Sequence, residues 1–205
     1  MPEDREKEGV FVEIELPESV LAPAVFIDRD GTIVSDEPYL HEVEKLKVLP
    51  GALAGIRLLR ESGYRIVMVT NQPGIGLGFY TKNDFFAVTK ELLRQAGQAG
   101  AIIDKVYFCP HSNTAGCPCR KPKTGLIERA VADLKLDLAA SYMIGDMSLD
   151  VLLGKNAGIP AILVRTGKGG RDDPDSAQAD YVVDDLEAAG RLICSLRAAS
   201  KLERR

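Results

Sequence analysis

Two aspartates two positions apart follow a short apolar segment near the start of the chain. Asp28 and Asp30 come directly after residues 24–27, in the sequence Asp-Arg-Asp-Gly-Thr. Residues i and i+2 of an extended segment point to the same side, and two neighbouring carboxylates repel each other unless a cation or a proton lies between them. Mg²⁺ prefers hard oxygen ligands. The pair therefore indicates a magnesium site.

A third aspartate follows a second apolar segment. Asp146 comes shortly after residues 142–144 and is a natural further magnesium ligand. Asp150 lies one helical turn beyond it, where it could bind through water or orient Asp146. Alone, Asp-x-Asp-Gly more often marks a turn, and Gly-Asp is equally typical of a helix N-cap. Their joint placement after apolar segments favours the metal site.

The same carboxylates predict a reaction at phosphorus. A carboxylate can attack phosphorus and form an acyl-phosphate, which divides one difficult step into two. We predict that Asp28 is this nucleophile and that Asp30 protonates the leaving alcohol and later deprotonates water. The phosphoryl group also needs hydrogen-bond donors, which the hydroxyl of Thr70, the backbone N–H groups after Asp28 and the ammonium of Lys121 can supply.

A second cluster of ligand types lies within eleven residues. Its members are Cys109, His111, Cys117 and Cys119. Thiolates and imidazole suit tetrahedral zinc, and four protein ligands leave no open coordination position. We predict a structural zinc that also fixes the direction of Arg120 and Lys121, which follow the last ligand. Without a metal, the alternative is three reduced thiols and a surface histidine.

The elements that must position these residues alternate along the chain. Apolar segments predict strands, and amphipathic segments between them predict helices, so right-handed crossovers and a doubly wound parallel sheet are expected. Ligands bind such sheets at the carboxyl ends of the strands, where the polar residues cluster. The predicted strands are 24–27, 66–69, 106–108, 142–144, 161–164 and 181–183. The predicted helices are 51–62, 81–93, 124–134, 147–156 and 186–199.

The bulk composition suits one α/β domain, over residues 24–205. Residues 1–23 are predicted to be an N-terminal arm or an extra strand, because residues 10–16 alternate apolar and acidic side chains. No stretch is long and apolar enough to span a bilayer, and the charged N-terminus lacks an apolar signal core, so we expect a cytoplasmic protein. The net charge of -4 argues against a general nucleic-acid binder. On size alone, a monomer is expected.

The chemistry-bearing motifs resemble the four motifs of the haloacid dehalogenase (HAD) superfamily in order and spacing. They are Asp28-Arg29-Asp30-Gly31-Thr32, Thr70-Asn71-Gln72, Lys121, and Gly145-Asp146 with Asp150. The resemblance implies a Rossmann-like core and an aspartyl-phosphate mechanism. It also implies phosphate binding by Thr70 and Lys121, with Asn71 beside them, and magnesium binding by Asp28, Asp146 and the backbone carbonyl of Asp30. The intervals between the motifs leave no room for a large cap, so we expect an open site and a small phosphorylated metabolite.

Within the superfamily, the chain resembles a subgroup that contains heptose bisphosphate and histidinol-phosphate phosphatases. Residues 38–41, 74–81 and 164–168 favour the heptose bisphosphate, a sugar of lipopolysaccharide biosynthesis, and Arg120 could bind its second phosphate or its hydroxyls. Against this, the short interval between His111 and Cys117 resembles the histidinol-phosphate enzymes, and Leu77 stands where heptose enzymes often have Arg.

From another class, a non-catalytic, zinc-stabilised binding protein could use the same scaffold. The presence of Asp30 argues against it, because a binding module needs no acid/base.

Overall fold

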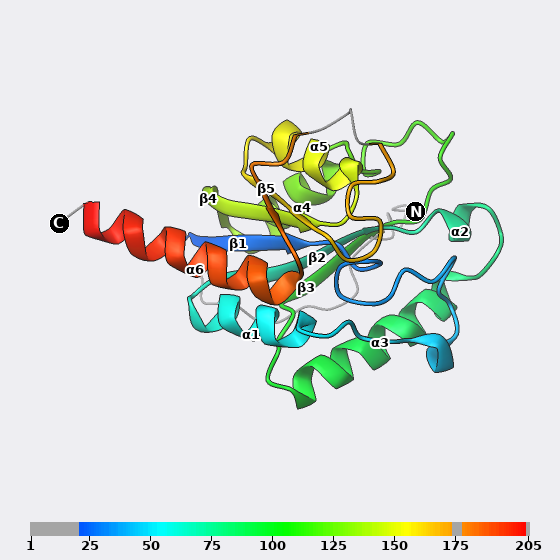
Figure 1. The fold of residues 1–205 in the computed structure, drawn as a ribbon. Coiled ribbons are helices and arrows are strands. Elements are labelled where there is room, and N and C mark those ends of the chain that lie inside the picture. The colour runs from blue at the N-terminus through cyan, green and yellow to red at the C-terminus, as the bar shows by residue number, and fades with distance from the viewer. Residues whose placement is uncertain (1–20, 174–177, 204–205) are drawn as a thin grey trace, which may run out of the picture.

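A six-stranded parallel sheet forms the centre of the computed structural model, which describes residues 21–173 and 178–203 (Figure 1). The strand order is β3-β2-β1-β4-β5-β6. The chain builds outward from β1 to β3, then crosses back to place β4 on the other side of β1. Ligands bind such sheets at this reversal, between the ends of β1 and β4. The strands are β1 (Ala22–Ile27), β2 (Arg65–Asn71), β3 (Lys105–Cys109), β4 (Leu136–Gly145), β5 (Ala161–Val164) and β6 (Tyr181–Val183).

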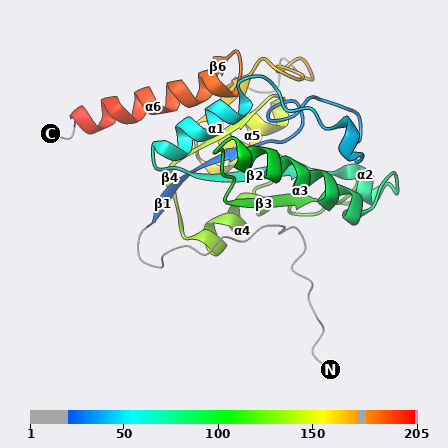
Figure 2. The same ribbon diagram turned by 90° about the horizontal axis from the view of Figure 1, so that it is seen from below.

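Helices cover both faces of the sheet, as the predicted doubly wound fold requires (Figures 1 and 2). One face packs against α1 (Ala52–Glu61), α3 (Lys82–Gln98) and α6 (Leu186–Glu203), and the other against α4 (Gly125–Leu134) and α5 (Ser148–Ala157). Two short elements complete the described chain: a 3₁₀ turn η1 (Val43–Lys45) and the helix α2 (Pro73–Gly76). Within the described ranges, the connections on the ligand side are loops and these short elements, so no large cap covers the sheet.

The strands have continuous apolar sequences because successive side chains are buried on opposite faces of the sheet, as β1 shows. Val25 and Ile27 pack into the core under α1, α3 and α6, whereas Ala24 and Phe26 pack into the core under α4 and α5. All four side chains are fully buried. A strand covered on both faces has no solvent side and therefore no polar alternation.

Most predicted elements are confirmed, and the differences lie at their ends. The helix predicted over 81–93 continues to Gln98, and Thr81 and Asp84 form a capping box at its start. The helix predicted over 124–134 is also present, and the hydroxyl of its N-cap residue Thr124 donates to Glu128 Oε1 at 2.5 Å instead of accepting a backbone N–H. β4 begins six residues before the predicted segment, and α2 was not predicted. The predicted strand over 10–16 lies outside the described residues, and β1 begins at Ala22, before the predicted domain boundary.

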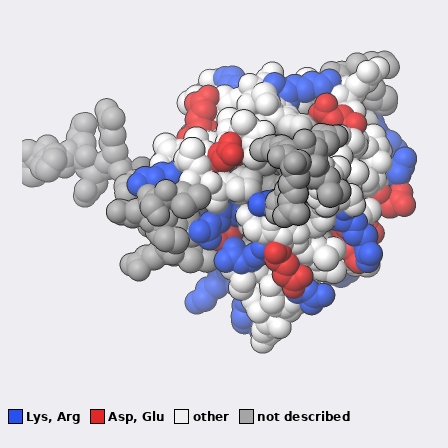
Figure 3. Space-filling view, turned by 90° about the vertical axis from the view of Figure 1, so that its left-hand side faces the viewer, with Lys and Arg blue, Asp and Glu red and all other residues white. Residues whose placement is uncertain are grey.

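The surface shows no segregation of charge on the face drawn in Figure 3. There, acidic and basic side chains alternate with uncharged ones. Among the described helices, none is long and apolar enough to cross a membrane.

Candidate active site

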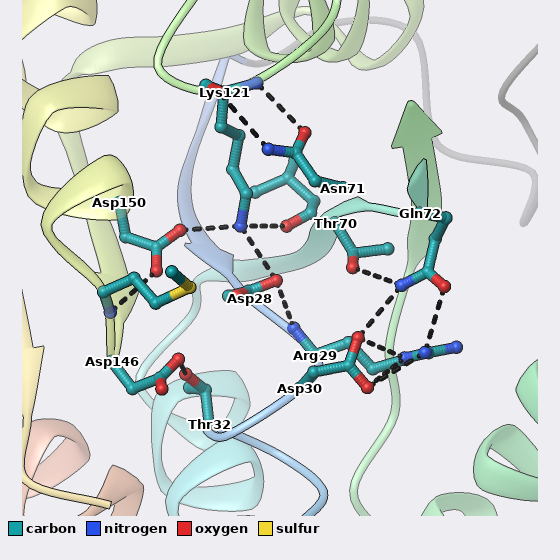
Figure 4. Close-up of polar contacts among 12 residues, drawn as sticks. Asp28, Arg29, Asp30, Thr32, Thr70, Asn71, Gln72, Lys121, Asp146 and Asp150 are labelled. Atoms are coloured by element: carbon teal, nitrogen blue, oxygen red, sulfur yellow. Dashed lines mark hydrogen bonds and ion pairs between the residues drawn. The ribbon is translucent and has the colours of Figure 1, made fainter. Parts of the chain in front are cut away.

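The polar residues predicted to cluster at strand ends line one pocket of about 220 Å³. Asp28 follows β1, Thr70 and Asn71 end β2, and Asp146 follows β4 (Figure 4). All residues predicted for the nucleophile, acid/base, phosphate and magnesium roles lie in its wall. The backbone N–H of Asp28 donates to the carbonyl of Ile144 at 3.0 Å, which joins the ends of β1 and β4.

Three buried carboxylates concentrate negative charge in this pocket. Oxygens of Asp28, Asp146 and Asp150 lie within 4.8 Å of one another. Burial raises the pKa of Asp28 well above its ordinary value; Lys121 opposes this shift and the neighbouring carboxylates add to it. Burial, with Asp150 beside it, raises the pKa of Asp146 to about 7. The cluster thus holds more negative charge than its surroundings neutralise.

Lys121 supplies the positive charge at the centre of the cluster. Its Nζ lies 2.8 Å from Asp28 Oδ1 and 2.6 Å from Asp150 Oδ1, and it also donates to the carbonyl of Val69 at 3.3 Å. Burial alone would lower the pKa of Lys121, but the carboxylates of Asp150 and Asp28 outweigh it, so the pKa is raised and the ammonium stays charged. One cation among three carboxylates leaves a net negative site.

Asp150 has a different partner from the predicted one. One of its oxygens accepts from Lys121, and the other accepts the N–H of Met147 at 3.1 Å, at the start of α5. It therefore orients Lys121 and the helix rather than Asp146.

Asp146 is instead held by the two loops that carry Thr32 and Lys168, a contact that sequence reasoning did not predict. Its Oδ2 accepts the N–H of Lys168 at 2.7 Å, and its Oδ1 accepts the hydroxyl of Thr32 at 3.3 Å. Gly31 and Gly167 both have positive φ angles, and a Cβ on either would clash with the Asp146 carboxylate. The glycines thus allow two loops to close directly around this side chain.

The Asp30 carboxylate does not point to the same side as that of Asp28, which corrects the prediction from their i, i+2 spacing. The chain turns after Asp28, and the Asp30 carboxylate points to Arg29 and Gln72 (Figure 4). It lies outside the cluster of Asp28, Asp146 and Asp150. Asp30 nevertheless lines the same pocket, with its side chain 24% exposed.

The two β2 residues predicted to bind phosphate differ in their hydrogen-bond partners. The Thr70 hydroxyl accepts from Gln72 Nε2 at 2.8 Å, so its own proton remains available for a ligand. The Asn71 amide is engaged with the backbone of Lys121, accepting its N–H at 3.0 Å and donating to its carbonyl at 3.3 Å. Asn71 thus supports Lys121 through both of its polar atoms, and its contact with phosphate stays a prediction.

Arg120 stands at the rim of the pocket. It lines both the carboxylate pocket and a neighbouring surface hollow beside Cys117. Its Nη1 is buried and has no hydrogen-bond partner among the described residues. A buried donor without a partner is costly, so this guanidinium is suited to an anionic or hydroxyl-bearing ligand.

The predicted zinc ligands converge beyond β3. Cys109 Sγ lies 3.5 Å from His111 Nδ1 and from Cys117 Sγ, and Cys119 Sγ lies 3.2 Å from Cys109 Sγ. The sulfur–sulfur distances approach the separation of about 3.8 Å that two Zn–S bonds impose in a tetrahedral site. All four cysteines of the chain are free thiols. The set can hold a metal ion, and its position next to Arg120 is as predicted.

Comparison with known proteins identifies the family. Residues 118–189 match a family model described as HAD-hydrolase-like. The D-glycero-beta-D-manno-heptose-1,7-bisphosphate 7-phosphatase of Pasteurella multocida is 36% identical over 183 residues, which cover 85% of this chain and 98% of that protein. The D-glycero-D-manno-heptose-1,7-bisphosphate 7-phosphatase of Thermosynechococcus vestitus is 38% identical over 84% of this chain and 96% of its own. The chain belongs to the HAD phosphatase family.

Solved structures of HAD phosphatases agree with this assignment. The D,D-heptose 1,7-bisphosphate phosphatase from B. bronchiseptica, complexed with magnesium and phosphate, matches with a TM-score of 0.79 and 28% identity, over 85% of this chain and 99% of that one. A HAD-like phosphatase from Mesorhizobium loti matches with a TM-score of 0.76 and 29% identity, over 94% and 95% of the two chains. The two curated relatives and the B. bronchiseptica structure are named for the heptose bisphosphate, one of the two substrates that the sequence suggested.

Proposed function

We propose that this HAD phosphatase removes the 7-phosphate of D-glycero-D-manno-heptose 1,7-bisphosphate through an aspartyl-phosphate on Asp28. The observation that carries the proposal is the pocket itself. A buried carboxylate, Asp28, contacts a buried ammonium, and a second carboxylate, Asp30, lines the same cavity. Relatives at 36 to 38% identity are named for this substrate.

The side chains support a reaction in two steps, formation of the aspartyl-phosphate and its hydrolysis. In the first, an Asp28 oxygen bonds to phosphorus while the bond to the ester oxygen breaks, and Asp30 gives its proton to that leaving oxygen. In the second, water attacks the same phosphorus, Asp30 takes a proton from it, and the bond to Asp28 breaks to release inorganic phosphate. Lys121 and the Thr70 hydroxyl would hold the phosphoryl oxygens during both steps.

The carboxylate cluster fits a divalent cation. Its members are buried oxygen ligands, and one lysine leaves them with excess negative charge. Asp28 and Asp146 would hold Mg²⁺, with the backbone carbonyl of Asp30 as a further ligand. When bound, the ion would neutralise charge between the nucleophile and the phosphoryl oxygens.

The Cys/His cluster fits zinc for a different reason. Its sulfur and nitrogen donors are soft, and all four come from the protein. Cys109, His111, Cys117 and Cys119 would hold the ion without an open position, so its role is to fix the loop that carries Arg120 and Lys121. Arg120 is then the proposed contact for the second phosphate of the substrate.

The test is phosphate release, with magnesium, from heptose 1,7-bisphosphate and histidinol phosphate side by side. We expect kcat/KM to favour the heptose by at least about a hundredfold, because each well-placed charge-assisted contact with the second phosphate strengthens binding. Phosphorus NMR of the product should show that the 1-phosphate remains. Equal or greater activity on histidinol phosphate would overturn the substrate assignment.

A further inference from the structure

Gln72, which directly follows β2, lies at the centre of a buried hydrogen-bond network. Its Nε2 donates to Asp30 Oδ2 at 2.9 Å and to Thr70 Oγ1 at 2.8 Å. Its Oε1 accepts from Arg29 Nη2 at 3.1 Å and from Tyr80 Oη at 2.6 Å. A glutamine amide has two N–H donors and two acceptor positions, and here all four are used. Figure 4 shows the bonds to Asp30, Thr70 and Arg29.

The partners fix which way the amide faces. If it were rotated by half a turn, the NH₂ group would meet the Arg29 guanidinium, and two donors would face each other. The carbonyl oxygen would then face the Asp30 carboxylate. The side chain of Gln72 is buried, as are those of Arg29 and Tyr80, so water cannot compensate for a wrong orientation. Arg29, which can only donate, therefore fixes the amide in the one arrangement that presents a donor to Asp30, and the Tyr80 hydroxyl donates to the same amide oxygen and reinforces that arrangement.

Arg29 holds Asp30 from a second direction. Its Nε lies 3.1 Å from both carboxylate oxygens, and its Nη2 lies 2.9 Å from Oδ1. The guanidinium is also 5.4 Å from the centre of the Phe85 ring and is 1% exposed. The direction of the Asp30 carboxylate is thus set by buried groups that do not line the pocket.

We propose that Gln72, held by Arg29 and Tyr80, is a positioning residue that aligns the acid/base Asp30 with the phosphoryl group held at Thr70. The inference rests on the proposed function, since it assigns Asp30 and Thr70 their roles in that reaction. A single amide hydrogen-bonds to both residues, so it fixes the separation between the proton donor and the phosphate-binding hydroxyl. Gln72 itself does not line the pocket, and its effect on the reaction is indirect.

The leaving group distinguishes this role from a purely structural one. The ester oxygen of a sugar phosphate must receive the Asp30 proton as its bond to phosphorus breaks. Nitrophenolate leaves as a stable anion and needs no proton. Misaligning Asp30 should therefore slow attack of Asp28 on the sugar phosphate and leave attack on p-nitrophenyl phosphate nearly unchanged.

The experiment measures the full chain in its metal-loaded form with both substrates. Tyr80→Phe removes only the hydroxyl that donates to Gln72, and Gln72→Met removes all four hydrogen bonds of the amide at similar volume. Tyr107→Phe is the matched control, because it removes another buried tyrosine hydroxyl, bonded to Asp133 at 3.0 Å and outside the network. Steady-state kcat and KM are measured with the heptose bisphosphate, and first-turnover nitrophenolate release with p-nitrophenyl phosphate.

We expect kcat on the sugar bisphosphate to fall about tenfold in Tyr80→Phe and about a hundredfold in Gln72→Met, within the usual range for general acid catalysis. KM and the first-turnover rate should stay within about twofold, and Tyr107→Phe should match the wild type. Equal losses on both substrates, or a gain in kcat, would overturn this inference alone. Absence of activity in the wild type would instead overturn the proposed function, and the inference with it.

Discussion

The molecule holds two clusters of metal-ligand side chains, and they are built in opposite ways. The carboxylate cluster gathers Asp28 and Asp146 from the ends of β1 and β4, and Asp150 from α5. The Cys/His cluster takes all its members from residues 109–119 at the end of β3. The first is assembled by the sheet, and the second by a single loop.

The two clusters should also make opposite contributions to the free energy of folding. Three buried carboxylates with one lysine repel each other, which costs free energy of folding in the absence of a cation. Such a site is a reactive pocket that the surrounding sheet must hold together. A closed set of thiolates and imidazole gains free energy of folding when a metal binds. Substitutions in the carboxylate cluster should therefore affect turnover far more than the stability of the fold. Substitutions in the Cys/His cluster should affect the stability of the fold far more than turnover.

Replacing the nucleophile should give the largest effect on turnover. In Asp28→Asn, an amide replaces the attacking carboxylate, and kcat should fall by at least about a thousandfold. The same change removes one of three repelling charges, so the melting temperature of the metal-free protein should be unchanged or higher. Calorimetry and phosphate release measure both. A large drop in melting temperature would break the proposed contrast.

Replacing the acid/base should give the next largest effect. Asp30→Asn cannot donate or accept the required proton, so kcat should fall about a hundred- to ten-thousandfold. Magnesium affinity should change less than about threefold, because the Asp30 carboxylate lies outside the metal cluster. Isothermal titration with Mg²⁺ checks this, and a much weaker magnesium affinity would place the carboxylate among the ligands after all.

A substitution in the loop around Asp146 tests the support of the metal site. The Cβ of Gly167→Ala would clash with the Asp146 carboxylate, so the magnesium concentration for half-maximal activity should rise about tenfold or more. Gly116→Ala, in the Cys/His loop, is the matched control. Gly116 also has a positive φ angle, but its Cβ would meet no atom within 4 Å. The same rise in both variants would show that backbone strain, and not contact with Asp146, is responsible.

The Cys/His cluster should show the smallest effect on turnover and the largest on stability. Cys117→Ser removes one thiolate, so zinc content should fall and the melting temperature should drop by about 5 °C or more. Cys194→Ser should retain zinc, because Cys194 lies by Ser62, away from the cluster. Elemental analysis and calorimetry measure the two quantities. Zinc at the wild-type level in Cys117→Ser, or none in the wild type, would contradict the assignment.

Sequence reasoning identified the residues at the strand ends but not the directions of their side chains. Asp28 and Asp146 could be placed because strand ends of a parallel sheet share one edge. The direction of Asp30 depends on Gln72, whose own orientation depends on Arg29 and Tyr80. The engagement of Asn71 with Lys121 likewise joins segments that meet only in the folded chain. Such contacts have no local pattern, although the Thr-Asn-Gln motif marked where they begin.

The most direct test of the central claim is capture of the phosphoenzyme. Substrate labelled with ³²P at the 7-phosphate is mixed with the enzyme and quenched in acid during the first turnovers. The account predicts label on the protein, located on Asp28 by peptide mapping, released by hydroxylamine and absent from Asp28→Asn. Full-rate phosphate release without any labelled protein at the earliest quench times, or label on another residue, would contradict it.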